Sequence, residues 1–447
     1  MRWFPLTFLM TVALASGAGA AELTMEESAL TALDNNPTVL AASERSLAAG
    51  ARSKQAKGHR WFSLNLSEIY SYTNNPAEVF AFKLNQGRFD FGEFTMTDPN
   101  DPDWLTTWIT RLELTVPIYT GGQLGNRINQ ADHMASAEEL RLAHTRDKVV
   151  FDTITAYTNL AKARDQVELM TTSRETTAEH VEIAQAYAGQ GLILDAEVLK
   201  ARVFLAQMDE LLAQANNGAR LAEAALNFEM GTDQNVPRQI TPMPLPPTAP
   251  GDLDDWVDVA VDRRHDLRAA RLELEAGRLE EKTTKPWYLP EVAATGKYEL
   301  YDDSIFGSNG HSGSVMAFAR LNLFQGGAES ASREAARHEA AAGEADVRRF
   351  EEGVRLEVQQ AWHDLHTSKV RLSTATNSLT AAREALRVRE HRFKQGLDKM
   401  IDLLDAETAL REAELRELVA RYDVSLSTYR LLFVSGGSPI QLTEESS

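Results

Sequence analysis

The sequence contains no cysteine. Disulfide frameworks, cysteine-ligated zinc, iron–sulfur clusters and thiol nucleophiles are therefore excluded. Basic residues are scarce relative to acidic ones, with 46 Lys and Arg against 65 Asp and Glu and a formal net charge of −19. This balance argues against a general nucleic-acid-binding protein, because such a protein needs a basic surface to neutralise phosphates.

Sequence signatures of the common enzyme classes are also missing. There is no Gly-x-Ser-x-Gly motif, no P-loop, no His-Glu-x-x-His motif and no glycine-rich dinucleotide fingerprint. The closest pair of histidines, His363 and His366 with Asp364 between them, is interpreted as solvated helix positions rather than as a metal site. We therefore predict a protein that is not an enzyme and that has no cofactor and no bound metal.

No apolar run reaches the roughly 20 residues that a membrane-spanning helix requires. Residues 1–20 instead have the form of a secretory signal peptide, with Arg2 ahead of a short apolar stretch that ends in Ala18-Gly19-Ala20. We predict that this segment is removed and that the mature protein is exported. A membrane-anchoring helix is the alternative interpretation.

The chain is too long for one compact core and repeats itself. A single core rarely grows beyond roughly 250–300 residues, and the chain has 447. Two glycine-containing segments of the first half recur in the second half at the same offset. Gly121-Gly122 matches Gly326-Gly327, and Gln190-Gly191-Leu192 matches Gln395-Gly396-Leu397. A fixed period of this length indicates two copies of one structural unit.

The predicted organisation follows from this repeat. Its parts are a signal peptide (1–20), a first repeat (21–230), a proline-rich periplasmic connector (231–252), a second repeat (253–436) and a C-terminal tail (437–447). Each repeat is predicted to run helix, two strands, long helix, turn, helix. The connector is expected to be extended because proline is frequent in it.

The long helices are predicted from two segments without proline, 123–188 and 328–393. Each would measure about 100 Å as one continuous helix. In the second segment apolar residues recur at every seventh position, namely Leu365, Leu372, Leu379, Leu386 and Phe393. A strict heptad pattern of this kind indicates supercoiled, closely packed helices.

Four segments of similar length alternate apolar and polar side chains, and they are 62–72, 108–118, 292–301 and 315–324. Segments of about ten alternating residues suit strands that cross the ~25 Å apolar band of an outer membrane. Tyrosine and tryptophan gather near their ends, which is typical of interfacial girdles. Four strands cannot close a barrel, whereas twelve strands from three chains could. The alternative is a soluble antiparallel sheet with one wet face.

Together these features resemble the TolC-like outer membrane efflux protein family. The resemblance rests on Asn36-Pro37, on the run 117–122 that leaves the second strand, on the paired Gly-Leu turns and on the duplicated plan. The second-copy run, 322–327, lacks the proline. The resemblance implies an α+β membrane protein, in which a homotrimeric 12-stranded outer-membrane β-barrel, with four strands per chain, continues as a long periplasmic α-helical coiled-coil barrel.

The family also implies a function and partners. The protein would be the outer membrane channel of a tripartite efflux or type I secretion system, and it would receive substrates from an inner-membrane transporter through a periplasmic adaptor. Its partners would be two further copies, that adaptor, that transporter and outer membrane lipid, but not nucleic acid. Drugs, metal ions and secreted proteins stay open as cargo. A periplasmic or surface coiled-coil scaffold is the alternative, and it explains the heptads but not the alternating segments.

The resemblance assigns a role to the two Gly-Leu turns. Gly191-Leu192 and Gly396-Leu397 would reverse the helix pairs at the periplasmic end and form the docking surface for the adaptor. Glycine at these positions is already explained by the turn, because a helix often ends on a residue with positive φ. The docking role is therefore carried by the family alone.

Acidic residues follow each turn. Glu197 and Asp402 stand at matching distances after the glycines, and Lys200 and Asp405 follow one helical turn later on the same face. The family implies that Asp402 and Asp405 ring a closed aperture on the three-fold axis, with Glu197 nearby. Such rings would form a gate that binds and selects cations. Solvated charges on a helix face are the alternative.

Two residues near the second turn depart from the family pattern. Phe393 stands where an aromatic that can hydrogen-bond is often found, and Asp398 stands where a basic residue is often found. Two links between helices of the gate are therefore not expected in that form. The surface loop 74–103 holds an aromatic segment, Phe80 to Phe94, which is expected to form a hairpin whose rings pack together; a receptor role is the alternative.

Overall fold

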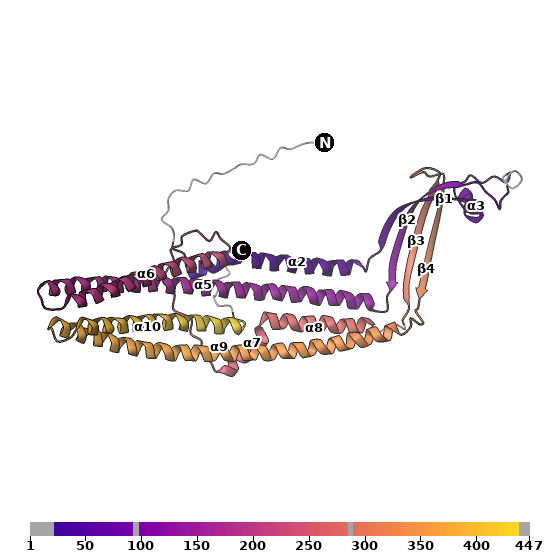
Figure 1. Ribbon diagram of the computed structural model, residues 1–447. Coiled ribbons are helices and arrows are strands. Elements are labelled where there is room, and N and C mark those ends of the chain that lie inside the picture. Colours follow the sequence, from indigo (N-terminus) through magenta and orange to yellow (C-terminus); the bar gives the residue numbers. More distant parts are fainter. Residues whose placement is uncertain (1–21, 93–97, 285–288, 438–447) are drawn as a thin grey trace. The chain divides into compact units, whose positions relative to one another are not determined.

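The computed structural model describes residues 22–92, 98–284 and 289–437 (Figure 1). The predicted signal peptide 1–20 lies outside the described residues, as do Phe94 and nearly all of the tail 437–447.

In the described part of the first half of the chain, three helices and two strands precede the two long helices. They are α1 (Met25–Asn35), α2 (Pro37–Gly58), β1 (Ser63–Thr73), α3 (Pro76–Asn85), β2 (Leu105–Tyr119), α5 (Gln123–Gly189) and α6 (Asp195–Glu229). The second half follows the same order without a counterpart of α3 among the described residues. Its elements are α7 (Leu253–Arg263), α8 (His265–Thr284), β3 (Glu291–Asp302), β4 (Gly310–Arg320), α9 (Ala328–Lys394) and α10 (Met400–Val434).

The long helices match in length between the two halves. α5 and α9 each have 67 residues, and α6 and α10 each have 35. The proline-free segments are thus continuous helices, as predicted. Within the described ranges, every helix is too short or too polar to span a membrane.

The chain divides into two compact units, and each unit takes segments from both halves. We call Arg45–Leu140 with Leu267–Phe350 the sheet unit. We call the residues up to Glu44, Arg141–Asp266 and the residues from Glu351 onward the helical unit. The compact units therefore do not coincide with the two sequence halves.

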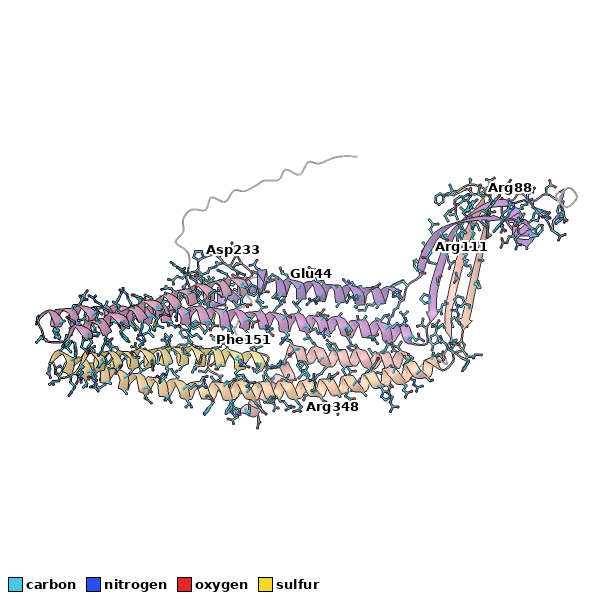
Figure 2. The ribbon with its side chains drawn as sticks, in the orientation of Figure 1. Glu44, Arg88, Arg111, Phe151, Asp233 and Arg348 are labelled. Carbon is cyan, nitrogen blue, oxygen red and sulfur yellow. The ribbon has the colours of Figure 1, made fainter. Side chains whose placement is uncertain are left out.

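The sheet unit is organised by one antiparallel sheet of four strands in the order β1-β2-β3-β4. The central β2–β3 pairing joins the two halves of the chain, with Leu112 opposite Tyr298. An ion pair between Arg111 of β2, labelled in Figure 2, and Glu299 of β3 crosses it. In the described part of the chain, β1 and β4 each pair along one edge only.

Three strands lie close to their predicted positions, whereas the fourth differs. The alternating pattern placed it at 315–324, but β4 spans Gly310–Arg320. Its start is set by pairing, because Gly310 lies opposite Tyr301 at the far end of β3. Beyond Arg320 the apolar alternation continues without a strand, and Asn322 there donates to Gln325 and Glu329. Side-chain alternation therefore misplaced both ends of this strand.

The surface loop between β1 and β2 contains helix α3, which the sequence interpretation missed. Asn75 caps this helix, since its side chain accepts from the backbone of Ala77, and Pro76 occupies the first helical position. Both are helix-start signals. The aromatic rings do pack together as predicted, with 5.2 Å between the ring centroids of Phe80 and Phe89.

The helical unit has a core where α1, α5, α6 and α10 meet. Its fully buried members are Ala29, Ile154, Tyr157, Leu160, Leu226 and Met230. The Tyr157 hydroxyl donates to the backbone carbonyl of Thr241 at 2.8 Å and so ties the connector to this core. Phe151 (Figure 2) stacks on Phe433 with 5.0 Å between centroids.

Candidate gate and docking turns

Two helix hairpins, α5–α6 and α9–α10, contain the turn and gate residues that the sequence predicted (Figure 1). Their turns lie in the helical unit. Gly191 and Gly396 lie two residues beyond the ends of α5 and α9, and both have φ of +73°. At the first turn the N–H of Gly191 bonds to the carbonyl of Ala188 and that of Leu192 to Tyr187. The second turn repeats this pattern. This is the Schellman arrangement, which satisfies the last helical carbonyls and requires positive φ.

The leucines after the glycines are presented to solvent. Leu192 is 65% exposed and Leu397 is 61% exposed. Further apolar side chains of the same hairpins are exposed as well, and they are Leu194, Leu199, Val203 and Ile401. An apolar surface of this kind is typical of a protein–protein contact.

A hydrophobic cluster beneath the turns joins the two hairpins. We call it the tip core, and its buried members are Val181 and Ala184 of α5, Val198 and Ala201 of α6, Leu386 and Phe393 of α9, and Met400, Leu403 and Leu404 of α10. Phe393 is buried and stacks on Tyr187 with 5.9 Å between ring centroids. Where the family often has a hydrogen-bonding aromatic, this chain thus has an apolar packing contact.

Glu197 is compensated within its own helix. Lys200 donates to it over 2.9 Å between Nζ and Oε1. The Glu197 side chain is 17% exposed and that of Lys200 is 51% exposed. The expected pairing on one helix face is therefore present, and it neutralises the acid on α6.

Asp402 and Asp405 both lie on α10, but in different surroundings. Asp402 is half-buried and accepts a hydrogen bond from the backbone N–H of Lys399 at 3.1 Å. It therefore caps the first turn of α10, where a carboxylate also interacts favourably with the helix dipole. Asp405 is exposed one turn later. Within the described residues, Glu197 pairs with Lys200 and not with either aspartate.

Asp398 is held by two arginines that the sequence interpretation did not identify. Arg392 donates through Nε at 3.0 Å and Arg389 through Nη1 at 3.1 Å. The Asp398 side chain is only 5% exposed. Hydrogen bonds from Arg392 and Arg389 hold the pKa of the Asp398 carboxyl below its usual value. The sequence does contain a feature that could have predicted this contact, because basic residues near the end of α9 are followed by an acid two residues after Gly396.

A second unpredicted contact lies deeper in the same hairpins. His180 of α5 and Glu407 of α10 form a pair through Nε2 and Oε1. Both side chains are nearly buried. Sequence patterning offers no direct signal for such a pair, because the two residues are far apart in the chain.

Comparison with known proteins identifies the family. The model of the outer membrane efflux protein family matches residues 30–232 and 256–437. These ranges cover most of the chain, and the chain belongs to this family. It is an outer membrane efflux protein.

Two curated relatives and one solved structure illustrate the similarity. The alkaline protease secretion protein AprF of Pseudomonas aeruginosa is 24% identical over 414 residues, which cover 91% of this chain and 82% of AprF. The outer membrane efflux protein BepC of Brucella suis biovar 1 is 21% identical over 337 residues, covering 75% of this chain and 73% of BepC. The CmeC outer membrane channel of Campylobacter jejuni shares the fold with a TM-score of 0.79 at 15% identity, covering 93% of this chain and 86% of CmeC.

Proposed function

We propose that three copies of this chain assemble into one channel. The observation that carries the proposal is the sheet, which has an unpaired edge at β1 and another at β4 in the described part of the chain. Unpaired backbone groups are costly inside a membrane, so the edges need partners. Exposed apolar side chains such as Leu64, Leu66 and Val315 suit contact with lipid. Twelve strands from three chains would close an outer-membrane barrel.

The helices would continue this barrel as an α-helical coiled-coil tunnel in the periplasm. The equal lengths of α5 and α9, and of α6 and α10, support the proposal that 21–230 and 253–436 are two copies of one unit. Three chains would then supply six similar hairpins around one axis. Such near-equivalence is what a tunnel of regular cross-section needs.

The channel would serve as the exit duct of a tripartite efflux or type I secretion system. In this role it receives substrates from an inner-membrane transporter through a periplasmic adaptor. The relatives support both forms, since AprF is described as a protease secretion protein and BepC as an efflux protein. The turns Gly191-Leu192 and Gly396-Leu397 would dock the adaptor, which their exposed leucines favour.

Acidic side chains would form the gate at the tip of the tunnel. On a three-fold axis, Asp402 and Asp405 would each become a ring of three carboxylates, with Glu197 nearby. Such rings attract and bind cations. The exposure of Asp405 supports this role. The capping bond of Asp402 to Lys399 is compatible with it, because one carboxylate can accept several hydrogen bonds.

The assembly is tested by the mass of the detergent-solubilised protein and by recordings in planar lipid bilayers. We expect a trimer by light scattering and discrete conductance steps after reconstitution. A folded, monodisperse monomer that inserts into bilayers would contradict the proposal. Release of the protein from the outer membrane by salt alone, as expected of a scaffold, would also contradict the proposal.

Docking is tested separately with photo-crosslinkers placed at Leu192 and Leu397. Both should capture the adaptor in cells. Leu221 is a matched control, because it is an equally exposed leucine (64%) on α6 but far along the helix from the turn. Equal capture at Leu221 would argue against a specific docking surface at the turns.

A further inference from the structure

The tip core contains a buried ionic pair that the proposed gate does not use. His180 of α5 and Glu407 of α10 are paired, and their side chains are 11% and 9% exposed. In the sequence His180 precedes Val181 of the tip core, and Glu407 follows Leu403 and Leu404. The pair therefore connects the α5–α6 hairpin to the α9–α10 hairpin inside the core that holds them together.

The polar atoms of this pair depend on each other. Both ring nitrogens of His180 and both carboxylate oxygens of Glu407 are buried, and no hydrogen bond of regular geometry reaches them from the described residues. The attraction between the two groups is thus what compensates their removal from water. Burying one charged group without its partner is strongly unfavourable.

The groups around His180 are mostly acidic. Glu407 faces it from α10, Glu390 from α9, and Glu179 precedes it on α5. Burial acts to lower the pKa of His180, but the close contact and charge of Glu407, with the charges of Glu390 and Glu179, outweigh it and hold this pKa above its usual value.

A cation, Arg411, lies about one turn after Glu407 on α10 and interacts with its charge. Its guanidinium is directed elsewhere, since Nη1 lies 2.9 Å from the sulfur of Met208 and the group sits 5.5 Å from the ring centre of Phe204. Burial lowers the pKa of Arg411, and Glu407 acts in the opposite direction. Arg411 therefore contributes to the local field without replacing His180 as the partner of Glu407.

We propose that His180 and Glu407 form a proton-dependent latch between the two hairpins. With the imidazole protonated, the pair holds α10 against α5 and keeps the tip closed. When His180 loses its proton, the Glu407 carboxylate is left as an unpaired buried charge, and the strain is relieved by separation of the helices. This inference rests on the proposed channel function, because the latch would act on its gate.

The position of Glu407 explains how the latch reaches the gate. Asp402, Asp405 and Glu407 lie within about two turns of one continuous helix. A displacement of α10 at Glu407 therefore moves both aspartates with it. The latch and the gate are two features of one rigid element.

The sign of the pH effect follows from the direction of the shift. The stabilisation by the pair is fully present below the ordinary imidazole pKa of about 6.5. It is lost as the pH rises through the higher value that His180 has in the folded protein. The latch is therefore closed at lower pH and released as the pH rises.

The first test is single-channel recording of the full-length protein from about pH 5.5 to about pH 8.5, which brackets the usual imidazole value. The open fraction should rise several-fold with pH. His180→Gln should stay open across the range, and His180→Lys, a permanent cation, should stay closed longer. His391→Gln is the matched control, since His391 is an exposed histidine near the same turns, and it should keep the wild-type profile.

Two outcomes would overturn the latch. One is an unchanged pH profile in His180→Gln, and the other is a wild-type open fraction that does not depend on pH. Absence of any conductance at all pH values would instead count against the proposed channel function. The two failures are therefore distinguishable.

A second measurement needs neither conductance nor a change at the latch. Because the chain has no cysteine, Ala184→Cys introduces a single thiol into the tip core at a fully buried position. Ala186→Cys, exposed on the same helix, corrects for the intrinsic pH dependence of alkylation. The rate of maleimide labelling in the Ala184→Cys variant, divided by the rate in the Ala186→Cys variant, should rise several-fold with pH. A constant ratio would contradict separation of the hairpins.

Discussion

The two hairpins of the helical unit have the same backbone and different charge chemistry. Their helices have equal lengths, and Gly191 and Gly396 have the same φ of +73°. In the α5–α6 hairpin the acid Glu197 is neutralised by Lys200. In the α9–α10 hairpin Asp402 caps the start of α10, and the side chain of Asp405 is exposed to solvent. A common scaffold thus leaves each hairpin free to acquire its own function.

The starts of α6 and α10 differ in the same sense. Leu194 precedes α6, makes no side-chain capping bond and is 74% exposed. Lys399 precedes α10, and its backbone N–H is bound by Asp402. The two helix starts therefore differ in capping, because a carboxylate closes the first turn of α10 and an exposed apolar side chain precedes α6.

The largest effect should come from removing the acid of the second hairpin. Asp402→Asn with Asp405→Asn keeps an oxygen that can cap α10 but removes both charges. We expect block by added divalent cations to weaken at least about tenfold, which corresponds to ~1.4 kcal/mol, and cation selectivity to fall. Single-channel recording measures both. Glu412→Gln, an exposed acid farther along α10, should change neither. Unchanged block in the double variant would place the aspartates on the outside of the tunnel.

The next effect should be shared by both hairpins. Gly191→Val and Gly396→Val each force a β-branched residue to positive φ, at a cost of about 1–2 kcal/mol or more. Among the described residues, no atom beyond the two chain neighbours lies within 4 Å of an added Cβ at either glycine, so the strain arises in the backbone. Export should fall several-fold while insertion in the membrane persists.

Gly189→Ala is the control for this pair, because Gly189 is helical and equally unobstructed. It should leave export intact. If both valine variants export normally, neither turn has the required geometry or the docking role.

A smaller effect should come from leaving Glu197 of the α5–α6 hairpin without its basic partner, so that this hairpin also has an uncompensated acid. Lys200→Met removes the partner of Glu197 and keeps the length of the side chain. The Lys200 side chain is half-exposed and its charge is screened by solvent, so we expect an increase in the cation permeability ratio of only about twofold. The reversal-potential shift in asymmetric salt measures it. A decrease would mean that Glu197 does not face the conducting path.

The smallest effect should come from weakening the contacts of Asp398 with Arg389 and Arg392 in the α9–α10 hairpin. Asp398→Asn weakens the contacts to Arg389 and Arg392, so hydrogen exchange near the second turn should quicken slightly at neutral pH. The pKa of Asp398 is lower in the folded protein than that of an ordinary carboxyl. The stability that its ionised form adds to the fold is therefore present above the ordinary pKa and is lost as the pH falls through the lower, folded-state pKa. The difference between variant and wild type should therefore shrink as the pH falls below the ordinary carboxyl pKa of about 3.9. A difference that persists there would point to another cause.

Helices and strands were predictable where one side-chain pattern dominates. The segments 123–188 and 328–393 differ by one residue each from α5 and α9 at their C-terminal ends, because absence of proline and heptad spacing both favour one long helix. β4 was misplaced because its ends depend on pairing with β3, which alternation does not record. α3 was missed although Asn75-Pro76 marks its start, since aromatic content dominated the interpretation of that loop.

The sequence by itself determined the family, the order of the elements and the two turns, because glycine, proline and side-chain periodicity act through local backbone preferences. Only the tertiary structure decided that Asp398 is buried between two arginines, that Asp405 is exposed, and that His180 meets Glu407. The burial of these groups and the contact between His180 and Glu407 depend on the rotation and register of one helix against another. Those quantities are set by packing across the tip core, between residues distant in the chain.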